Sequence, residues 1–419
     1  MVGPGGGTQG WEVRRPVDVD VVCLGESMVA FVPSRPGRLA DVPSFERGIG
    51  GAESNAACAL AAAGHAVKWV SRVGADAFGD HVVSTVSGYG VDVAGVRRDP
   101  ARPTGVYFRT ADDRSAGSHE VAYYRAGSAA SAMSVANVPW GEVWAGRVLH
   151  LSGITAALSA DCLELMRSLL ARRPGRPLVS FDVNYRAGLW RSGSPSGPEV
   201  LLELARGADV VFVGEDEAEA AWGLAGPAAV RAALPEVGVV VVKRGERGVT
   251  VFESPTPPLP ESLRRVSFGC GTSGADRAVP RAPYASGARG TARATQHGPQ
   301  PNDSLGATRR SRTCHSREGA GWGKVTAVPA PRVDVVAPVG AGDAFAAGFL
   351  HGTLRGLTAR ERARHGHLMA AAVLTVPGDH TSPPSRAHAD RLAALDDDAW
   401  GRLRLGPGWT GDEQEVRTP

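Results

Sequence analysis

Val339-Gly340-Ala341-Gly342-Asp343-Ala344-Phe345-Ala346-Ala347-Gly348-Phe349-Leu350 is a glycine-flanked turn that runs directly into an apolar helix, with a carboxylate at the junction. The glycines allow backbone angles closed to other residues, so successive N–H groups can converge on an anion where the helix dipole also favours negative charge. This is the chemistry of a phosphate-binding turn. Asp343 is placed to accept a proton from a hydroxyl that attacks a terminal phosphate. Because Asp is also a favoured N-cap, the turn alone leaves base and helix cap open.

The bulk properties of the chain allow one large α/β domain with an appendage, or two ordinary domains, since it has 419 residues. The formal charge of +3 is small for this size and predicts no general attraction to nucleic acid or membranes. Five cysteines lie far apart without a C-x-x-C pair, which argues against a zinc knuckle or disulfide framework and favours the cytoplasm. No stretch approaches the roughly 18 apolar residues that a membrane span needs.

Short, β-branched apolar runs recur along the chain, with helical stretches such as Ser159 to Arg172 between them. This alternation predicts right-handed β-α-β crossovers, and hence an α/β fold with a doubly wound, mostly parallel sheet and helices on both faces. Ligands of such sheets bind beyond the carboxyl ends of the strands. The predicted strands are Val19 to Leu24, Val148 to Leu151, Leu178 to Phe181, Val210 to Val213 and Val239 to Val242.

Three kinds of segment break this rhythm. The region 29–45 and the alternating stretches Gly105 to Arg109 and Val121 to Arg125 predict strands with one wet and one covered face, for which an ordinary antiparallel edge is one explanation. Residues 254–323 are dense in Pro, Gly, Ser, Thr, Ala and Arg without periodicity, which predicts a low-complexity, disordered insertion. An acidic partner for this insertion and a translation-frame artefact of a GC-rich gene are both open. Residues 1–17 are predicted to be a disordered lead and 396–419 a C-terminal tail.

Two further motifs give the chain a family resemblance. Gly50-Gly51-Ala52-Glu53-Ser54-Asn55-Ala56-Ala57 is followed, after an alanine-rich helical run, by Val70-Ser71-Arg72-Val73-Gly74-Ala75-Asp76-Ala77-Phe78-Gly79. With the turn at Asp343, these resemble the signatures of the ribokinase-like (PfkB) carbohydrate kinases over roughly 18–253 and 324–390. The resemblance implies a kinase domain at 18–253 and 324–395, with a small β lid from about 29–45 and 103–126 that closes over the sugar.

A kinase site must supply a base, an anion-binding turn, magnesium ligands and a substrate clamp, because phosphoryl transfer depends on positioning and charge stabilisation. The resemblance assigns Asp343 as the general base and the backbone amides of Gly340, Ala341 and Gly342 as the anion hole. Glu217 matches the glutamate of the family's N-x-x-E motif, which is associated with water-bound Mg²⁺. The acidic first turn of an exposed helix would have the same sequence.

The substrate clamp resembles that of the 2-keto-3-deoxygluconate kinase branch. The strings that carry this likeness are Gly25-Glu26-Ser27-Met28, the glycine-rich string at Gly50, and Phe181-Asp182-Val183-Asn184-Tyr185-Arg186-Ala187-Gly188-Leu189-Trp190. Guanidinium groups pair bidentately with carboxylates, so two arginines suit a sugar acid. The residues that match the branch's sugar-acid contacts are Gly51, Tyr107, Tyr123, Arg125 and Arg186, and Asn55 is expected to meet sugar hydroxyls or cap its helix.

The nucleotide side is expected at Lys243-Arg244-Gly245-Glu246-Arg247-Gly248, which follows a predicted buried strand and resembles the family's nucleotide loop. Gly245 would permit close approach of phosphate and Lys243 would lend charge. The implied cofactors are ATP and Mg²⁺, with Lys243, Gly245, Gly340 and Gly342 around the nucleotide. A homodimer or higher homo-oligomer is also expected, because lid strands of relatives pair across a dimer.

Three departures from the family pattern keep other functions open. Ala337 stands where relatives carry an aspartate that serves as a monovalent-cation ligand, Gly214 replaces the asparagine of N-x-x-E, and the insertion enters near the expected adenine. A ribokinase- or fructokinase-type neutral-sugar kinase, or a catalytically impaired protein that binds sugar or nucleotide, therefore remains an alternative. The first predicted strand is not followed by G-x-G-x-x-G, which argues against a nicotinamide-dependent dehydrogenase.

Overall fold

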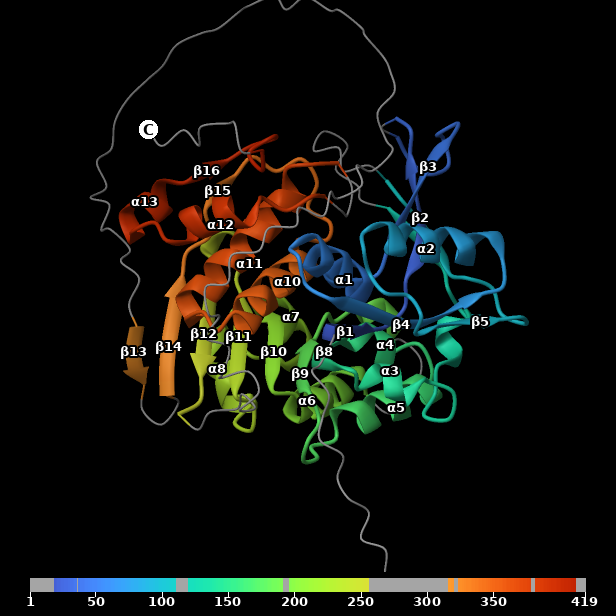
Figure 1. The fold of residues 1–419 in the computed structure, drawn as a ribbon, viewed down its shortest axis with the longest axis horizontal. Coiled ribbons are helices and arrows are strands. Elements are labelled where there is room, and N and C mark those ends of the chain that lie inside the picture. The colour runs from blue at the N-terminus through green and yellow to red at the C-terminus, as the bar shows by residue number, and fades with distance from the viewer. Residues whose placement is uncertain are drawn as a thin grey trace, which may run out of the picture.

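The computed structural model describes residues 19–35, 37–110, 120–190, 196–255, 316–319, 323–377 and 381–411. The predicted lead (1–17) and nearly all of the predicted insertion (254–323) lie outside these ranges. The described chain forms one large sheet covered by helices, with a small sheet beside it (Figure 1). None of the described helices has both the length and the apolar character needed to traverse a bilayer.

The large sheet confirms the predicted fold class, and each of the predicted strands lies in it. From β11 through β5 all neighbours are parallel, whereas β12, β14 and β13 continue the other edge in antiparallel fashion. In spatial order the strands are β13 (Ser316–Gly319), β14 (Gly323–Val328), β12 (Val249–Glu253), β11 (Val239–Lys243), β10 (Val210–Gly214), β9 (Leu178–Asp182), β8 (Gly146–Ser152), β1 (Val19–Leu24), β4 (Val67–Gly74) and β5 (Val96–Asp99).

Helices cover both faces because the strands are apolar on both sides. In β1, Val21 and Cys23 pack into one core and Val22 and Leu24 into the other, and all four are fully buried. The first core contains residues of α1 (Ala52–Ala62), α2 (Ala77–Gly88), α10 (Ala341–Leu354), α11 (Ala359–Leu374), α12 (Arg386–Ala393) and α13 (Asp397–Arg402). The second contains residues of α3 (Trp140–Val143), α4 (Gly153–Ala156), α5 (Ala160–Leu170), α6 (Gly197–Gly207), α7 (Glu215–Trp222) and α8 (Gly226–Ala233).

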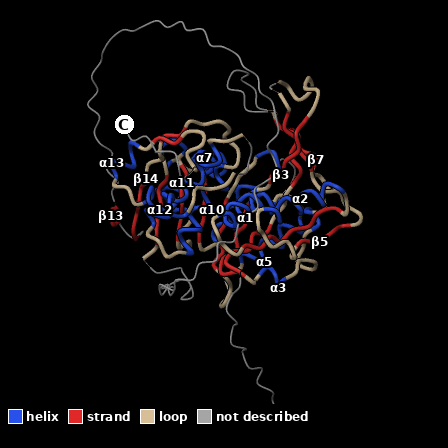
Figure 2. The backbone as a smooth tube through the Cα atoms, turned by 45° about the horizontal axis from the view of Figure 1, so that its top comes forward, coloured by secondary structure: helices blue, strands red, loops and turns tan. Residues whose placement is uncertain are grey.

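The alternating segments form a separate small sheet and not an edge of the large one (Figure 2). Phe31 stacks on Phe108 with ring centroids 4.8 Å apart, and Phe45 and Phe78 contact these rings edge-on, which covers one face. Tyr123 on the outer strand is 52% exposed. In spatial order the strands are β3 (Phe45–Gly50), β2 (Met28–Pro33), β6 (Val106–Arg109) and β7 (Val121–Tyr124).

The C-terminal boundary needs correction, because residues 397–405 of the predicted tail (396–419) belong to the packed domain. They contain α13 and β16 (Arg404–Leu405), which pairs with β15 (Arg332–Val333). Trp400 is fully buried and its Nε1 donates to the carbonyl of Pro329 at 2.8 Å, and Trp409 is also buried. Isolated tryptophans in a polar stretch give no periodic signal, so the sequence did not indicate their burial.

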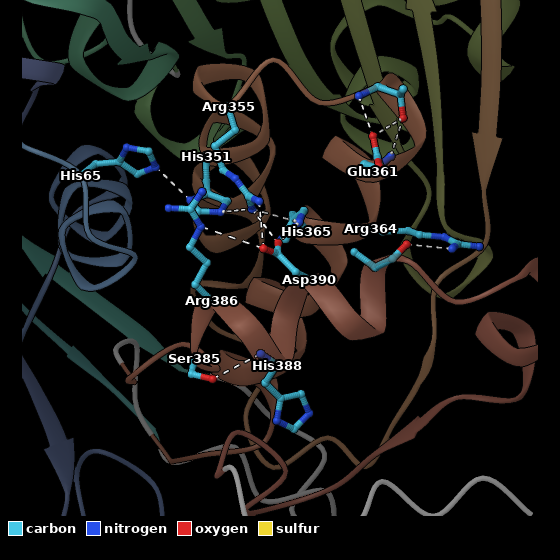
Figure 3. Close-up of polar contacts among 12 residues, drawn as sticks. His65, His351, Arg355, Glu361, Arg364, His365, Ser385, Arg386, His388 and Asp390 are labelled. Carbon is cyan, nitrogen blue, oxygen red and sulfur yellow. Dashed lines mark hydrogen bonds and ion pairs between the residues drawn. The ribbon is translucent and has the colours of Figure 1, made fainter. Parts of the chain in front are cut away.

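A polar network ties the far end of α10 to the chain after α1 and to α11 and α12 (Figure 3). His351 on α10 lies between His65, whose Nε2 is 2.9 Å from His351 Nδ1, and Arg355, whose Nη1 is 3.0 Å from His351 Nε2. Arg355 donates to both oxygens of Asp390 at 2.7 and 2.9 Å, and His365 Nε2 lies 3.2 Å from Asp390. Burial, reinforced by neighbouring cations, lowers the pKa of His351 to about 2 and of His365 to about 4. The folded protein therefore holds both imidazoles neutral.

We expect His351 and His365 to lower the free energy of unfolding as the pH falls from 7 to 5, whereas the raised pKa values of Asp343 and Glu53 act in the opposite direction. Histidines of the unfolded chain bind protons below about pH 6.5, whereas His351 and His365 stay neutral when folded, so each lowers stability by about 2 kcal/mol at pH 5. Urea-unfolding midpoints at the two pH values measure the effect. The double variant His351→Gln/His365→Gln should be less stable at pH 7 but lose less on acidification. An equal loss in both proteins would contradict this origin.

Candidate active site

The candidate site forms where α10 begins. Gly340 is the N-cap of α10 and adopts a left-handed φ of 78°, which glycine tolerates without steric cost. The helix starts at Ala341, so Asp343 is its third residue. Asp343 is therefore not the N-cap of α10. The first N–H groups of a helix have no intrahelical acceptor, and the helix dipole makes this end favourable for anions. The predicted anion-binding turn is thus a helix N-terminus with an acid in its first turn.

Asp343 is held in an environment that raises its pKa to about 7. Burial is the main cause, and the nearby Asp182 carboxylate adds to it. Asn55 on α1 donates from Nδ2 to Asp343 Oδ2 at 2.9 Å and, with Lys243, acts in the opposite direction. Asn55 therefore contacts the candidate base and is not the N-cap of α1, which is Gly51. A carboxylate with this pKa can exchange protons near neutral pH.

Lys243 joins the ends of two parallel strands at this site. It is the last residue of β11, and its Nζ lies 3.1 and 2.9 Å from the two carboxylate oxygens of Asp182, the last residue of β9. A Cβ added to Gly342 would lie 3.5 Å from Lys243 Nζ, so the ammonium stands beside the turn. Burial opposes the charged form, but Asp182, Glu217 and Asp343 outweigh it and raise the pKa of Lys243. Lys243 is therefore a cation next to the anion-binding helix end.

Glu217 and Arg186 form a second group, at the start of α7. Glu217 lies in the acidic first turn of α7, the alternative that the sequence left open, and its Oε2 also accepts a hydrogen bond from the backbone N–H of Gly214 at 2.9 Å. Arg186 Nη1 lies 3.7 Å from Glu217 Oε1, and its side chain is 54% exposed. The structure thus places Arg186 next to the candidate metal residue.

The small sheet carries the other predicted sugar contacts. Tyr107 and Tyr123 stack with ring centroids 5.6 Å apart, and the Arg125 guanidinium lies 5.8 Å from the Tyr123 ring centroid. Arg125 forms an ion pair with Glu26, which follows β1. Gly51 lies against Glu26, since a Cβ on Gly51 would be 2.2 Å from the Glu26 carbonyl oxygen. These residues therefore link the small sheet to the end of β1 and the start of α1.

Several buried polar atoms around these groups lack a hydrogen-bond partner among the described residues: Asn55 Oδ1, Asn184 Oδ1 and Arg125 Nε. Asn184 also has a φ of 42°, which is unusual for a residue other than glycine and costs backbone strain. Buried polar groups normally have partners, so these atoms fit a ligand rich in hydroxyl groups. Gly245 has a φ of 53° at the start of the short 3₁₀ helix η3 (Gly245–Arg247), where glycine is favoured.

The structure brings Asp343, Asn55, Lys243 and Gly342 together, and it adds residues that the sequence did not single out. Asp182 and Glu26 each stand at or just after the end of a buried strand, where sheet ligands bind, and that position is the signal that would have found them. Glu53 is fully buried, and its Oε1 accepts hydrogen bonds from Ser152 and Thr155 at 2.8 to 3.1 Å. Burial raises the pKa of Glu53 to about 7.

The doubly wound sheet with a small sheet beside it is the fold of the ribokinase-like phosphotransferases. The chain belongs to the pfkB family of carbohydrate kinases, because the model of that family matches residues 18–264 and 316–386. It is accordingly an enzyme that transfers a phosphoryl group to a sugar hydroxyl.

The chain is similar to several individual members of this family. The chain is 29% identical over 383 residues to the 2-dehydro-3-deoxygluconokinase of Bacillus subtilis. The aligned region covers 90% of this chain and 95% of that protein. The chain is 32% identical over 236 residues to the 2-dehydro-3-deoxygluconokinase of Thermoproteus tenax, spanning 56% and 72%. A crystal structure of a PfkB protein from Polaromonas sp. JS666 aligns with a TM-score of 0.64 at 26% identity, covering 89% of this chain and 99% of that one. A Pyrococcus horikoshii sugar kinase in complex with ATP aligns with a TM-score of 0.63 at 21% identity, covering 91% and 99%.

We expect Asn55→Ala to raise the pKa of Asp343 further above 7, because it removes the hydrogen bond that stabilises the ionised carboxylate. NMR titration of protein labelled at the aspartate carboxyl carbons measures this, with Asp343→Asn identifying the resonance. Asn137→Ala, which alters an exposed asparagine elsewhere, is the control. A lower pKa in Asn55→Ala would contradict the arrangement.

Proposed function

We propose that this carbohydrate kinase transfers the γ-phosphate of ATP to a primary hydroxyl of a sugar acid, with 2-keto-3-deoxygluconate (2-dehydro-3-deoxygluconate) as the first candidate. The observation that carries the proposal is the position of Asp343, in the first turn of α10, with a pKa of about 7 and a hydrogen bond from Asn55. A base with this pKa combines adequate strength with a large ionised fraction at neutral pH. The names of the relatives from B. subtilis and T. tenax support the choice of sugar acid.

In the proposed reaction, the sugar hydroxyl oxygen attacks the γ-phosphorus while Asp343 takes the hydroxyl proton. The bond from the γ-phosphorus to the bridging oxygen breaks, and ADP carries away the electron pair. Negative charge on the transferring group meets the backbone amides of Gly340, Ala341 and Gly342 at the end of the α10 dipole. Lys243, beside Gly342, adds a fixed positive charge. Together with Gly245, these groups form the proposed nucleotide side.

Magnesium would be held through water at Glu217. Glu217 Oε2 already accepts the Gly214 N–H, while Oε1 lies 3.7 Å from Arg186, so Oε1 remains for a metal-bound water. Mg²⁺ keeps several waters and uses substrate phosphates as ligands, so this sparse donor set fits it. When bound, the ion supplies charge neutralisation on the phosphates. The P. horikoshii sugar kinase solved with ATP supports ATP as the donor.

The sugar side is assigned to Gly51, Asn55, Tyr107, Tyr123 and Arg125. The unpartnered Nε of Arg125 is a buried donor for a carboxylate, and Asn55 Oδ1 is a buried acceptor for a hydroxyl. Gly51 has no room for a side chain, which keeps the start of α1 against the end of β1. Arg186, at the carboxyl end of β9 but paired with Glu217, is assigned to the border between sugar acid and phosphate.

Asp343→Asn should reduce kcat by several orders of magnitude while sugar binding persists, because the amide keeps the shape of the side chain but cannot accept the proton. ADP release with Mg-ATP and 2-keto-3-deoxygluconate measures turnover, and calorimetry measures sugar binding. Asp80→Asn, which alters a 76% exposed carboxylate, is the matched control. Sugar binding by the unaltered protein without ADP release would instead favour a kinase-like binding protein.

Arg125→Ala should lower kcat/KM for the sugar acid by about 10- to 100-fold, the range expected for losing a hydrogen bond to a charged group. Ribose and fructose have no carboxylate, so any activity on them should change little. A panel of sugars and sugar acids assayed by ADP release tests this, with Arg167→Ala, a partly exposed arginine on α5, as the control. Wild-type preference for a neutral sugar would favour the ribokinase- or fructokinase-type alternative.

A further inference from the structure

A buried ion pair joins the two sheets at the sugar side of the site. Glu26 stands two residues after β1 of the large sheet, and Arg125 stands directly after β7 of the small sheet. Arg125 Nη2 contacts Glu26 Oε2, and the side chains are only 10% and 1% exposed. Removing one partner of a buried pair leaves an uncompensated charge, so the pair constrains both sheets strongly.

Glu26 is itself fixed from several directions. Ser128 donates from Oγ to Glu26 Oε1 at 2.6 Å. A Cβ added to Gly105, next to β6, would lie 3.1 Å from Glu26 Oε1, and one added to Gly51 would lie 2.2 Å from the Glu26 carbonyl oxygen. The Glu26 carboxylate is therefore held by the chain after β7 and lies close to Gly105 before β6, while the Glu26 backbone is packed against the start of α1.

The pair leaves part of the guanidinium free. Arg125 Nη2 is occupied by Glu26, but Arg125 Nε is buried and has no partner among the described residues. The guanidinium is planar and its donors have fixed directions, so holding one nitrogen determines where the others point. The Tyr123 ring, stacked on Tyr107, stands against the guanidinium and restricts it further.

We propose that Glu26 is a positioning residue for substrate recognition: it anchors Arg125 so that the remaining donors of the guanidinium face the carboxylate of the sugar acid. The inference rests on the proposed function, since it assigns Glu26 an effect on the sugar acid through Arg125. Glu26 takes no part in the proton transfer, which belongs to Asp343. Its loss should therefore appear in KM for the sugar acid and not in kcat or in KM for ATP.

Glu26→Gln tests the proposal, because glutamine keeps the size of the side chain and an acceptor for Arg125 but removes the charge. We expect KM for the sugar acid to rise about tenfold, because the charge-assisted hydrogen bond from Arg125 to the sugar carboxylate is weakened. The values of kcat and of KM for ATP should stay within twofold. Glu203→Gln, which weakens the exposed Arg167–Glu203 pair between α5 and α6, should leave all three parameters unchanged. A fall in KM for the sugar acid would overturn the proposal, since it would mean that Glu26 only neutralises Arg125.

A double-mutant cycle separates positioning from a general structural role. In the Arg125→Ala background, Glu26→Gln should raise KM no further, because its effect passes through the guanidinium. An equal additional rise in that background would overturn the proposal, and thermal melting of each variant checks that it is folded. If Arg125→Ala alone leaves the sugar-acid KM unchanged, the sugar-acid function fails. If Arg125→Ala raises KM and Glu26→Gln does not, only the role of Glu26 fails.

Discussion

The close approach of the chain after β1 to the start of α1 is the constraint on which the rest of the site depends. A Cβ on Gly25 would lie 2.1 Å from the Glu53 carboxyl carbon, and a Cβ on Gly51 would lie 2.2 Å from the Glu26 carbonyl oxygen. Only glycine allows these two segments to touch. Their contact places Asn55, one turn into α1, against Asp343 on α10. The hydrogen bond between Asn55 and Asp343, which are 288 positions apart, therefore depends on glycine at positions 25 and 51.

Burial and neighbouring charges set the pKa values of the groups around that contact. Asp343, Asp182 and Glu53 bring three carboxyl groups to one region, and Lys243 is the cation that interacts with two of them. Burial raises the pKa of both Asp343 and Glu53 to about 7, and for Asp343 the neighbouring Asp182 carboxylate adds to the shift. The same arrangement keeps Lys243 charged despite its burial. A site of this kind sacrifices folding stability, because carboxyl groups exposed to water would be ionised at neutral pH. The raised pKa values agree with a role in proton transfer.

The sequence predicted the strands, whose apolar pattern recurs along the chain. It did not predict contacts that depend on a single residue. The β-branched runs and the glycine-flanked turn at Gly340 gave the doubly wound sheet and the position of Asp343. Arg186 and Arg125 were both matched to the sugar acid because both suit a carboxylate, but local sequence cannot show that Arg186 lies 3.7 Å from Glu217. Asp182 lies in the string Phe181 to Trp190 that carries the family likeness, but nothing in that string indicates a contact with Lys243. Its contact with Lys243 follows only from the spatial order of β9, β10 and β11.

The two candidate arginines raise a question of selectivity, because each already has a carboxylate partner. Arg125 pairs with Glu26 and Arg186 with Glu217, so neither side contributes an uncompensated positive charge to an incoming sugar acid. Net charge therefore gives little discrimination between a sugar acid and a neutral sugar. Discrimination has to come from directed hydrogen bonds, for which Arg125 is better suited than Arg186, since its guanidinium is buried and held while that of Arg186 is 54% exposed. The anchoring of Arg125, and not the number of arginines, is thus what would let this site recognise a carboxylate.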